Sequence, residues 1–468
     1  MKKITRITIF LFSLLILVPV FFMNFKGNQV SLTDNRMLAE NPFKAESREP
    51  GERIPAAVER YISDRIGFRD EIILSYTLLN DKLFGEMVHP FYSYGKDGYI
   101  FGGILDIQYD EYHEDFANMV ADLQTYCNDR GIPFLFVFDP SKTTVLSEYL
   151  PEGVNYSADW VNTLMEALDE RGVNYVNNTQ MLIDKTAQGE VVFNQKFDAN
   201  HWNELGAFYG VNEILKELQK DLPNITLNTK DEFDISKKVE ETLLLSEFPI
   251  NEEVPVFTGK ETVEEVSGEI ANELELDVNY RNFGIYHNEE KLEQKVPSIL
   301  SFQGSYLNHI GLEFMENALG EYVVVHNYQN IINAPYYINL FQPEAVVFEV
   351  AEYTLENDYF SQDGMKAINW NKPLKDREAV LEETDADMSK VNVPEVEKGK
   401  SLTILSWNLG EIIDHAWILM GDKEYDMMAS EEKDGVYTLT IQNEIYEEYK
   451  DSFEIVVEKD KTLTRYSF

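Results

Sequence analysis

The sequence predicts an α/β protein with a mainly parallel sheet, preceded by a membrane-spanning helix and followed by a small all-β module. Helical and strand patterns alternate between about residues 111 and 375, which is typical of a sheet with helices on both faces. An uncharged run stands near the start of the chain, and short strands between polar turns fill residues 395–468. With 468 residues, 44% of them hydrophobic, the chain can form a sizeable core and an accessory module.

Residues 1–26 are typical of a membrane anchor. Lys2, Lys3 and Arg6 precede an uncharged run over 7–23, which is close to the length that spans a bilayer. Positive charges before a span place the N-terminus in the cytoplasm. The following residues are mostly bulky, whereas a cleavage site needs small ones, so the pattern favours an uncleaved anchor over a removed signal peptide. We therefore expect a single-pass protein of the cell membrane whose bulk lies outside the cytoplasm.

Charge and cysteine content limit the partners. The chain has 83 acidic and 40 basic side chains, a formal charge of −43 that would repel phosphate backbones, so no nucleic-acid partner is expected. Its single cysteine, Cys127, excludes an internal disulfide framework and lies in an apolar helical pattern that predicts a core position. The histidines outside the motifs below form no ligand pair, so we expect no metal site and no cofactor. They are His89, His113, His287, His326 and His415.

Irregular segments frame and interrupt the α/β domain, which is expected over 111–375. Residues 27–110 predict a juxtamembrane region containing a charged amphipathic helix over 57–85 and a turn and strand over 95–103. Residues 220–295 form short alternating segments rich in Glu, Thr and Val, which predicts a β-rich insertion. Helices are expected over 116–131, 158–172, 203–219 and 307–320, and strands over 133–138, 173–176, 296–302, 321–326 and 345–353.

A charged stretch over 371–400 resembles a linker. After it, alternating apolar segments over 395–468 predict the all-β module. Such modules often bind carbohydrate, although the composition points to no binding site here.

The first candidate for chemistry is F-D-A-N-H-W-N-E-L-G-A, residues 197–207, where a carboxylate stands three residues before a histidine as a helix begins. On a loop at a sheet edge, Asp198 can accept a hydrogen bond from one imidazole nitrogen of His201 and leave the other free as a base. The carboxylate would also stabilise the imidazolium formed in reaction. Alternatively, His201 only helps to cap the helix while Trp202 packs beneath it, because short motifs recur by chance.

The second candidate is Ser305, which follows Gly304 between an apolar strand and a helix. A serine at such a turn presents its hydroxyl above the sheet, and its own amide near the helix N-terminus can stabilise an oxyanion. The alternative is a plain helix N-cap. His309 is a rival base four residues on, but no acidic neighbour orients it, so His201 is preferred.

Side chains next to these motifs are expected to line the substrate site. The strand over 345–353 ends in polar residues, and open α/β sheets bind ligands at that edge. Glu349, inside the same apolar run, could instead pair with a buried partner. The expected substrate-binding residues are Trp202, Tyr306, Glu352 and Tyr353.

These motifs resemble the SGNH hydrolase-like family. The last sequence block of that family has the form D-x-x-H with a glycine five residues on, and D-A-N-H-W-N-E-L-G at 198–206 fits it. The first block, a strand ending in G-D-S, corresponds to S-F-Q-G-S at 301–305. The Asp/His block precedes the serine block, as in the circularly permuted branch of DHHW-type proteins and periplasmic alginate O-acetylation proteins. Many DHHW relatives carry D-x-H-W, whereas here the aspartate is one residue further from the histidine.

Further segments resemble the same branch and together cover most of residues 31–355. They are the N-terminal anchor, N-R-M-L-A-E-N-P from residue 35, Y-I-S-D-R-I-G-F-R at 61–69, G-K-D-G-Y at 95–99, D-P-S-K at 139–142 and A-V-V-F-E-V-A-E at 345–352. The resemblance implies a three-layer fold with Ser305, His201 and Asp198 as catalytic residues. It further implies O-acetyl transfer onto an exported bacterial polysaccharide, with a membrane-bound O-acyltransferase as the acyl donor.

Two alternatives stay open at this point. The same residues would serve a surface polysaccharide esterase, because water can replace the sugar hydroxyl as acceptor. The second alternative is a non-catalytic cell-wall assembly or binding protein, because Q-G-S departs from the G-D-S block of the family.

Overall fold

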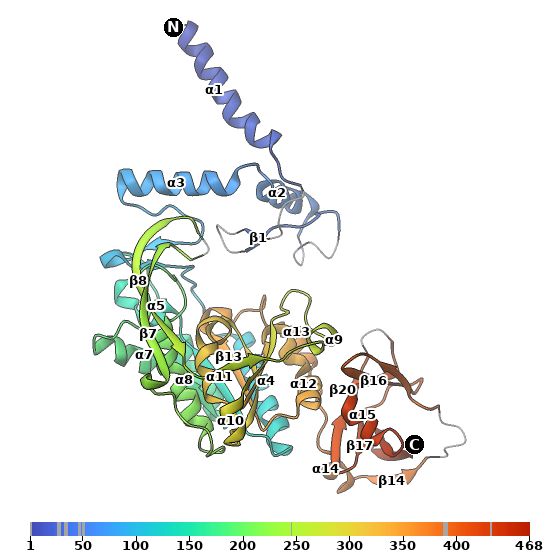
Figure 1. Cartoon of the computed structure of the whole chain (residues 1–468). Helices are drawn as coiled ribbons and strands as arrows, with labels where there is room; N and C mark the ends of the chain where they lie inside the picture. The colour runs from blue at the N-terminus through green and yellow to red at the C-terminus, as the bar shows by residue number, and fades with distance from the viewer. Residues whose placement is uncertain are drawn as a thin grey trace.

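The computed structural model describes residues 2–25, 30–31, 36–44, 48, 52–244, 246–386, 392–430 and 433–468. Its first helix, α1 (Lys2–Phe21), extends away from the rest of the protein (Figure 1). Among the described residues, one helix is long and apolar enough to cross a membrane, Lys3–Phe21, and none of its apolar window is buried. Two further helices, α2 (Ile54–Asp64) and α3 (Arg69–Phe84), lie between α1 and the α/β domain (Figure 1). The family-like segment that starts at residue 35 begins outside the described residues.

Seven strands form the central sheet of the α/β domain. They are β5 (Phe134–Asp139), β6 (Tyr175–Asn177), β9 (Val263–Glu265), β10 (Phe283–Asn288), β11 (Ser298–Gln303), β12 (Glu321–His326) and β13 (Ala345–Ala351). Their order is β6-β5-β13-β11-β12-β10-β9. The first five are parallel, and β10 and β9 complete one edge in antiparallel register. Strands β5 and β13 are buried along their whole length, as expected for parallel strands covered on both faces.

Helices cover both faces of this sheet, which confirms the predicted three-layer α/β fold. One face carries α4 (Glu111–Asp129), α6 (Asp159–Glu170), α12 (Ala334–Phe341) and α13 (Gln362–Ala367). The other carries α7 (Thr179–Ala187), α8 (Glu204–Leu218) and α11 (Leu312–Ala318). Cys127 of α4 is fully buried in the first of these cores, as predicted.

Residues 220–295 contain the strands that the sequence predicts, but these strands divide between two places. β7 (Phe233–Thr242) and β8 (Pro249–Gly259) form a separate hairpin. Phe233 and Phe257 of this hairpin pack into the core beside α8 and α11. Strands β9 and β10 instead extend the main sheet through β12. Alternating polarity does not specify which strand is the partner, because the partner is distant in sequence.

The C-terminal module consists of two sheets that enclose a shared core containing Trp407, Ile418 and Ile455. Its strands are β14 (Glu382–Asp385), β15 (Glu395–Lys398), β16 (Leu402–Asn408), β17 (His415–Met420), β18 (Lys423–Asp426), β19 (Met428–Ala429), β20 (Val436–Gln442), β21 (Phe453–Lys459) and β22 (Thr462–Ser467). The stretch 371–400 is therefore more than a linker, because β14 pairs with β22 and β15 with β16. Charged edge strands are difficult to distinguish from a linker in sequence.

The carboxyl ends of the parallel strands meet at one edge of the main sheet. β5 leads into D-P-S-K, β11 into Gly304 and Ser305, and β13 into Glu352 and Tyr353. Because open α/β sheets bind ligands at this edge, these segments are where a site is expected.

Candidate active site

Asp198 and His201 lie on the loop before α8, where a hydrogen-bonded turn holds them together. One carboxylate oxygen, Asp198 Oδ1, accepts from the backbone N–H groups of Asn200 at 2.9 Å and His201 at 3.0 Å. The other, Oδ2, lies 2.9 Å from His201 Nδ1. The side chain of Asn203 caps α8 by accepting from the Gly206 N–H at 3.0 Å. Asn203, and not His201, is therefore the helix cap.

Ser305 is 104 residues further along the chain, yet it lies beside His201. It follows β11 and opens the π-helical segment Tyr306–Gly311, which leads into α11. Its hydroxyl oxygen lies 2.8 Å from His201 Nε2. The Ser305 side chain makes no capping bond to this described helix, so the N-cap alternative does not account for its position. The structure thus brings together the three residues that the sequence singled out.

The charge of Asp198 determines which ring nitrogen of His201 carries a proton. Burial alone would raise the pKa of the Asp198 carboxyl, but the charge and hydrogen bonds of His201 and the N–H of Asn200 lower that pKa below its ordinary value. The carboxylate can only accept hydrogen bonds, so Nδ1 of His201 carries the proton. Its Nε2 is left with a lone pair that faces Ser305. This tautomer is the one that a general base requires.

Tyr353, just after β13, reaches both of these side chains. Its hydroxyl oxygen lies 2.8 Å from Ser305 Oγ and 2.9 Å from His201 Nε2. The Nε2 atom has one lone pair, so when Ser305 donates to it, Tyr353 donates to the serine oxygen. Burial raises the pKa of the Tyr353 phenol well above its ordinary value, so the hydroxyl keeps its proton and remains a donor.

Replacing Tyr353 by phenylalanine is expected to slow acyl transfer or hydrolysis by about two- to tenfold. The variant loses one hydrogen bond, which is worth about 0.5–1.5 kcal/mol, while the ring still packs. Steady-state kinetics with a chromogenic acetyl ester measure the effect. The matched control is Tyr359→Phe, a nearby tyrosine that forms no hydrogen bond with Ser305 or His201 among the described residues and should leave the rate unchanged. A Tyr353→Phe rate equal to that of the wild type would show that the contact is incidental.

The other predicted substrate-binding residues are buried, which corrects that expectation. Trp202 and Tyr306 have no exposed surface, and Glu352 is 2% exposed. The rings of Trp202 and Tyr306 meet edge to face at 5.0 Å, and the Tyr306 ring lies 5.2 Å from that of His201. Glu352 accepts a hydrogen bond from the Ser141 N–H at 2.8 Å. These side chains therefore support the site from beneath.

A buried lysine, to which no sequence motif gave a role, supports the loop of Asp198. Lys142, the last residue of D-P-S-K, is fully buried. When protonated, its Nζ donates to the carbonyl oxygens of Ile100 at 2.8 Å, Gln195 at 3.2 Å and Asp198 at 3.0 Å. Burial lowers the pKa of Lys142 to about 7 even though the Asp198 carboxylate opposes the shift. The available signal was a lysine three residues beyond the end of a buried strand.

Methionine at position 142 is expected to remove a pH-dependent part of the stability. Between pH of about 7 and the ordinary lysine pKa of 10.5, the unfolded chain binds a proton at this position and the folded chain does not. The free energy of unfolding should therefore rise with pH in this window, by up to about 1.4 kcal/mol per pH unit from this group. Urea denaturation at several pH values should show that slope in the wild type and in the exposed control Lys216→Met, and its loss in Lys142→Met. Equal slopes in all three proteins would contradict the prediction.

The turn before Ser305 is held by Glu349 and lies close to Asn327. The Gly304 N–H donates to Glu349 Oε2 at 2.6 Å. A Cβ atom on Gly304 would lie 3.3 Å from Asn327 Nδ2 and 3.5 Å from Glu349 Oε2, so glycine suits this close approach. Burial and the neighbouring Asp139 raise the pKa of the Glu349 carboxyl well above its ordinary value. Glu349 thus has the buried partner that the sequence left as an alternative.

Among the described residues, neither His309, the alternative base, nor a metal-binding cluster belongs to this site. His309 is exposed, and among the described residues no hydrogen bond joins it to Ser305 or to a carboxylate. Within the same described part of the chain, no three His, Cys, Asp or Glu side chains are placed to hold a metal ion.

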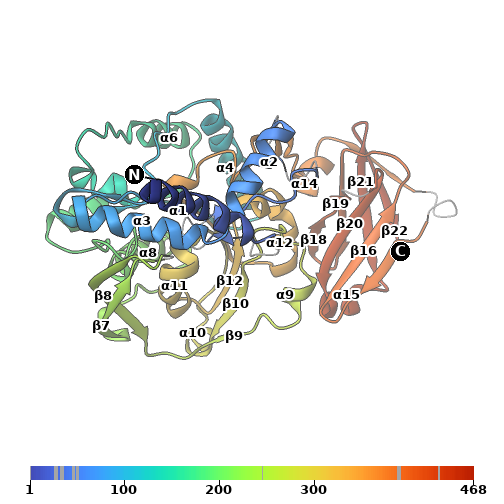
Figure 2. The ribbon, with the colours of Figure 1, turned by 90° about the horizontal axis from the view of Figure 1, so that it is seen from above.

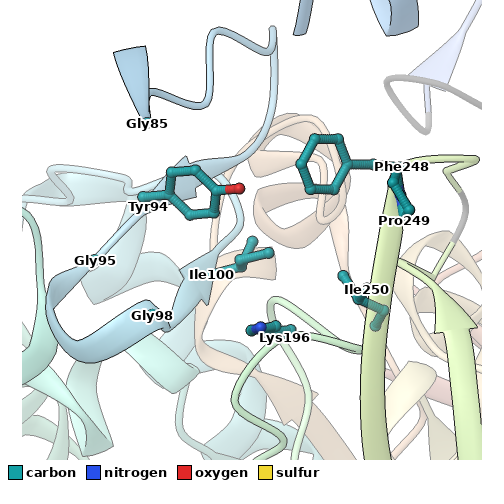
Figure 3. A pocket seen from close by; sticks show the side chains of 9 residues that line it. All are labelled: Gly85, Tyr94, Gly95, Gly98, Ile100, Lys196, Phe248, Pro249 and Ile250. Carbon is teal, nitrogen blue, oxygen red and sulfur yellow. The ribbon is translucent and has the colours of Figure 1, made fainter. Parts of the chain in front are cut away.

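A cavity of about 380 Å³ lies beside Lys196, two residues before Asp198 (Figure 3). The side chains that line it are Tyr94, Ile100, Lys196, Phe248, Pro249 and Ile250. Asp198, His201 and Ser305 do not line it, so we assign it no part in the chemistry.

An open α/β sheet with a Ser-His-Asp arrangement at its carboxyl edge is typical of SGNH hydrolase-like proteins. Residues 93–272 match the family model described as SGNH hydrolase-like domain, acetyltransferase AlgX. The resemblance inferred from the motifs is thereby confirmed. The matched range includes Asp198 and His201 and ends before Ser305. At the level of the family, the match supports O-acetyltransferase activity.

Several solved structures are similar to this chain. PatB1 of Bacillus cereus is 15% identical with a TM-score of 0.45, over 57% of this chain and 97% of that one. The O-acetyltransferase domain of Pseudomonas putida AlgJ is 13% identical with a TM-score of 0.42, over 60% and 99%. A DHHW family protein from Eubacterium siraeum is 17% identical with a TM-score of 0.42, over 58% and 92%. No curated protein matches the sequence significantly.

Proposed function

We propose that this protein is an extracytoplasmic O-acyltransferase that acetylates an exported or cell-surface polysaccharide through an acyl-serine intermediate. The single observation that carries the proposal is the contact of 2.8 Å between Ser305 Oγ and His201 Nε2, with Asp198 2.9 Å behind the imidazole. The match to an acetyltransferase family over residues 93–272 supports the choice of acyl group.

In the first half of the reaction, His201 Nε2 takes the proton of Ser305 as the serine oxygen attacks the acyl carbonyl of the donor. The tetrahedral intermediate collapses, the donor oxygen or sulfur leaves with the proton from His201, and the acetyl group remains on Ser305. In the second half, His201 removes the proton of a sugar hydroxyl, whose oxygen attacks the acyl-serine. The proton then returns to Ser305 as the acetylated sugar leaves.

The oxyanion of both intermediates needs donors at the sheet edge. We assign the backbone N–H of Ser305 to this role, because it lies in the first turn of a helical segment, where N–H groups have no intrahelical acceptor. The partial positive charge of that helix end favours the same negative oxygen.

The setting at the membrane follows from α1. We propose that α1 anchors the chain in the cell membrane with its N-terminus in the cytoplasm, and that a membrane-bound O-acyltransferase supplies the acetyl group. Anchoring raises the effective concentration of Ser305 at such a donor. The C-terminal module is proposed to hold the polysaccharide acceptor. We propose the same regions as predicted from the sequence: a juxtamembrane region over 27–110, the catalytic domain over 111–375 and the C-terminal module over 395–468.

One experiment separates transfer from the esterase and non-catalytic alternatives. The full chain in detergent is incubated with a chromogenic acetyl ester, with and without oligosaccharide, and the sugar is analysed by mass spectrometry. Acetylated sugar supports the proposal, whereas hydrolysis that is unaffected by added sugar supports an esterase. A fluorophosphonate probe that labels wild type but not Ser305→Ala identifies the nucleophile. No labelling and no ester turnover would favour a non-catalytic protein.

A further inference from the structure

Helix α3 has two apolar faces, and one of them is exposed. Leu74 and Leu78 pack inward against a cluster that includes Ala199. On the opposite side, apolar residues recur at spacings of four, three and four, which places them on one side of the helix. We call these residues the α3 row; they are Ile72, Tyr76, Leu79 and Leu83. Leu79 is 53% exposed and Leu83 is 61% exposed, so the row is an apolar stripe that no described part of the chain covers.

The end of α1 is attached to the start of α3. The Phe22 ring lies 5.0 Å from that of Phe68, the residue before α3. The Gly67 N–H donates to the Pro19 carbonyl at 3.0 Å. A Cβ atom on Gly67 would lie 2.5 Å from the carbonyl oxygen of Phe22, so the two backbones are in close contact. The turn between α2 and α3 is therefore level with the last turn of α1.

This attachment determines where α3 lies relative to a membrane. Figure 1 shows α3 lying along the side of the α/β domain from which α1 extends, with α1 rising obliquely from it. Figure 2, seen from above, shows α1, α2 and α3 all lying over that domain. If α1 spans a bilayer, its last turn ends at the outer surface. Because α3 begins at that level and lies along the side of the domain nearest α1, it runs along the surface. The inner side of α3 packs on the domain, so the α3 row points to the bilayer.

We propose that α3 is an interfacial helix whose row inserts into the outer surface of the lipid bilayer. The inference rests on the proposed membrane span of α1 and goes beyond it. Tyr76 suits this depth because a phenol has an apolar ring and a polar tip. Lys82 flanks the row and can extend its charge to the headgroups. With a formal charge of −43, the chain gains nothing from anionic lipids, so the contact should be apolar and insensitive to salt.

The position of the active site follows from the inner face of α3. Leu74 and Leu78 contact the cluster that contains Ala199, the residue after Asp198. A helix held at the bilayer surface would thus hold the Asp198–His201 loop at a fixed height above it.

The test uses the full chain, whose single native cysteine is fully buried, so that one added cysteine can be labelled selectively. A fluorophore is attached at Leu79→Cys, and the protein is reconstituted in phosphatidylcholine vesicles containing a spin-labelled quencher lipid. Leu14→Cys in α1 and the exposed Lys450→Cys in the C-terminal module are the comparators. We expect the labels at positions 14 and 79 to lose most of their emission, at low and at high salt, and the label at 450 to keep it.

Quenching at position 14 without quenching at position 79 would contradict the proposal that α3 lies in the membrane interface, but it would still support α1 as the membrane anchor. If neither label is quenched, the anchor fails and the inference fails with it, whereas chemistry at Ser305 is tested separately. A label at 79 that neither the lipid quencher nor iodide reaches would mean that a second copy covers the row, which also overturns the proposal.

A row variant gives a second measurement. In Leu79→Glu/Leu83→Glu, a label at Ile72→Cys should escape lipid quenching, because charged side chains disfavour insertion of the row. The matched control Glu71→Gln/Ser75→Gln alters two exposed polar residues of the same helix and should remain quenched. Hydrolysis of a water-soluble acetyl ester should be unchanged in both, which would establish that the variants fold. Quenching at 72 that persists in the row variant would contradict the proposal.

Discussion

Alanine at position 305 is expected to reduce the rate of acetyl-donor turnover by about 10⁴- to 10⁶-fold. Without the hydroxyl no acyl-enzyme forms, and residues that act as a unit lose nearly all of their effect when one is removed. The Ser305 side chain contacts His201 and Tyr353 at the edge of the sheet and caps no described helix, so its loss should leave the fold unchanged.

Pre-steady-state kinetics with a chromogenic ester measure the effect, because the wild type should show a burst of one released group per active site and the variant none. Circular dichroism and the urea midpoint serve as folding controls. A folded Ser305→Ala variant that retains the burst would eliminate Ser305 as the nucleophile.

Alanine at position 201 is expected to have an effect of similar size, about 10⁴- to 10⁶-fold, since His201 both removes the serine proton and protonates the leaving group. The matched control is His309→Ala. His309 lies four residues after Ser305, but it is exposed and forms no described bond to the serine or to a carboxylate, so its loss should leave the rate near that of the wild type.

The two variants are compared over a range of pH with the same ester. The His309→Ala profile should follow that of the wild type, and the His201→Ala rate should be low throughout. A larger loss of rate in His309→Ala than in His201→Ala would show that His309, and not His201, is the general base.

The elements of the α/β domain could be predicted because their patterns are local. The helix expected over 116–131 is found as α4, Glu111–Asp129, and the strand expected over 345–353 as β13, Ala345–Ala351. Continuous apolar runs identify buried parallel strands, and a helical stripe identifies a packed helix. The placement of β9, β10 and β14 could not be predicted, because their partners are distant in sequence. The edge strands β9 and β14 are in addition rich in charged side chains, which resemble those of an insertion or a linker.

The candidate site also combines a contact between neighbouring residues, which a sequence pattern can predict, with a contact between distant segments, which it cannot. Asp198 and His201 are three residues apart, so their contact is local, and a turn closed by Asp198 Oδ1 brings it about. The contact of Ser305 with His201 needs β11 and the loop before α8 to meet at the carboxyl edge of the sheet. The motif suggested these residues, and the tertiary structure places them within hydrogen-bond distance.

By itself, the sequence determined the fold class, the buried position of Cys127 and the identity of the three candidate residues. These depend on periodicity and on short spacings, which neighbouring residues specify. The tertiary structure alone decided that Trp202, Tyr306 and Glu352 are buried supports, that Tyr353 reaches the serine, and that Lys142 holds the loop. Those roles depend on which segments pack together, and packing brings together residues that no local pattern connects.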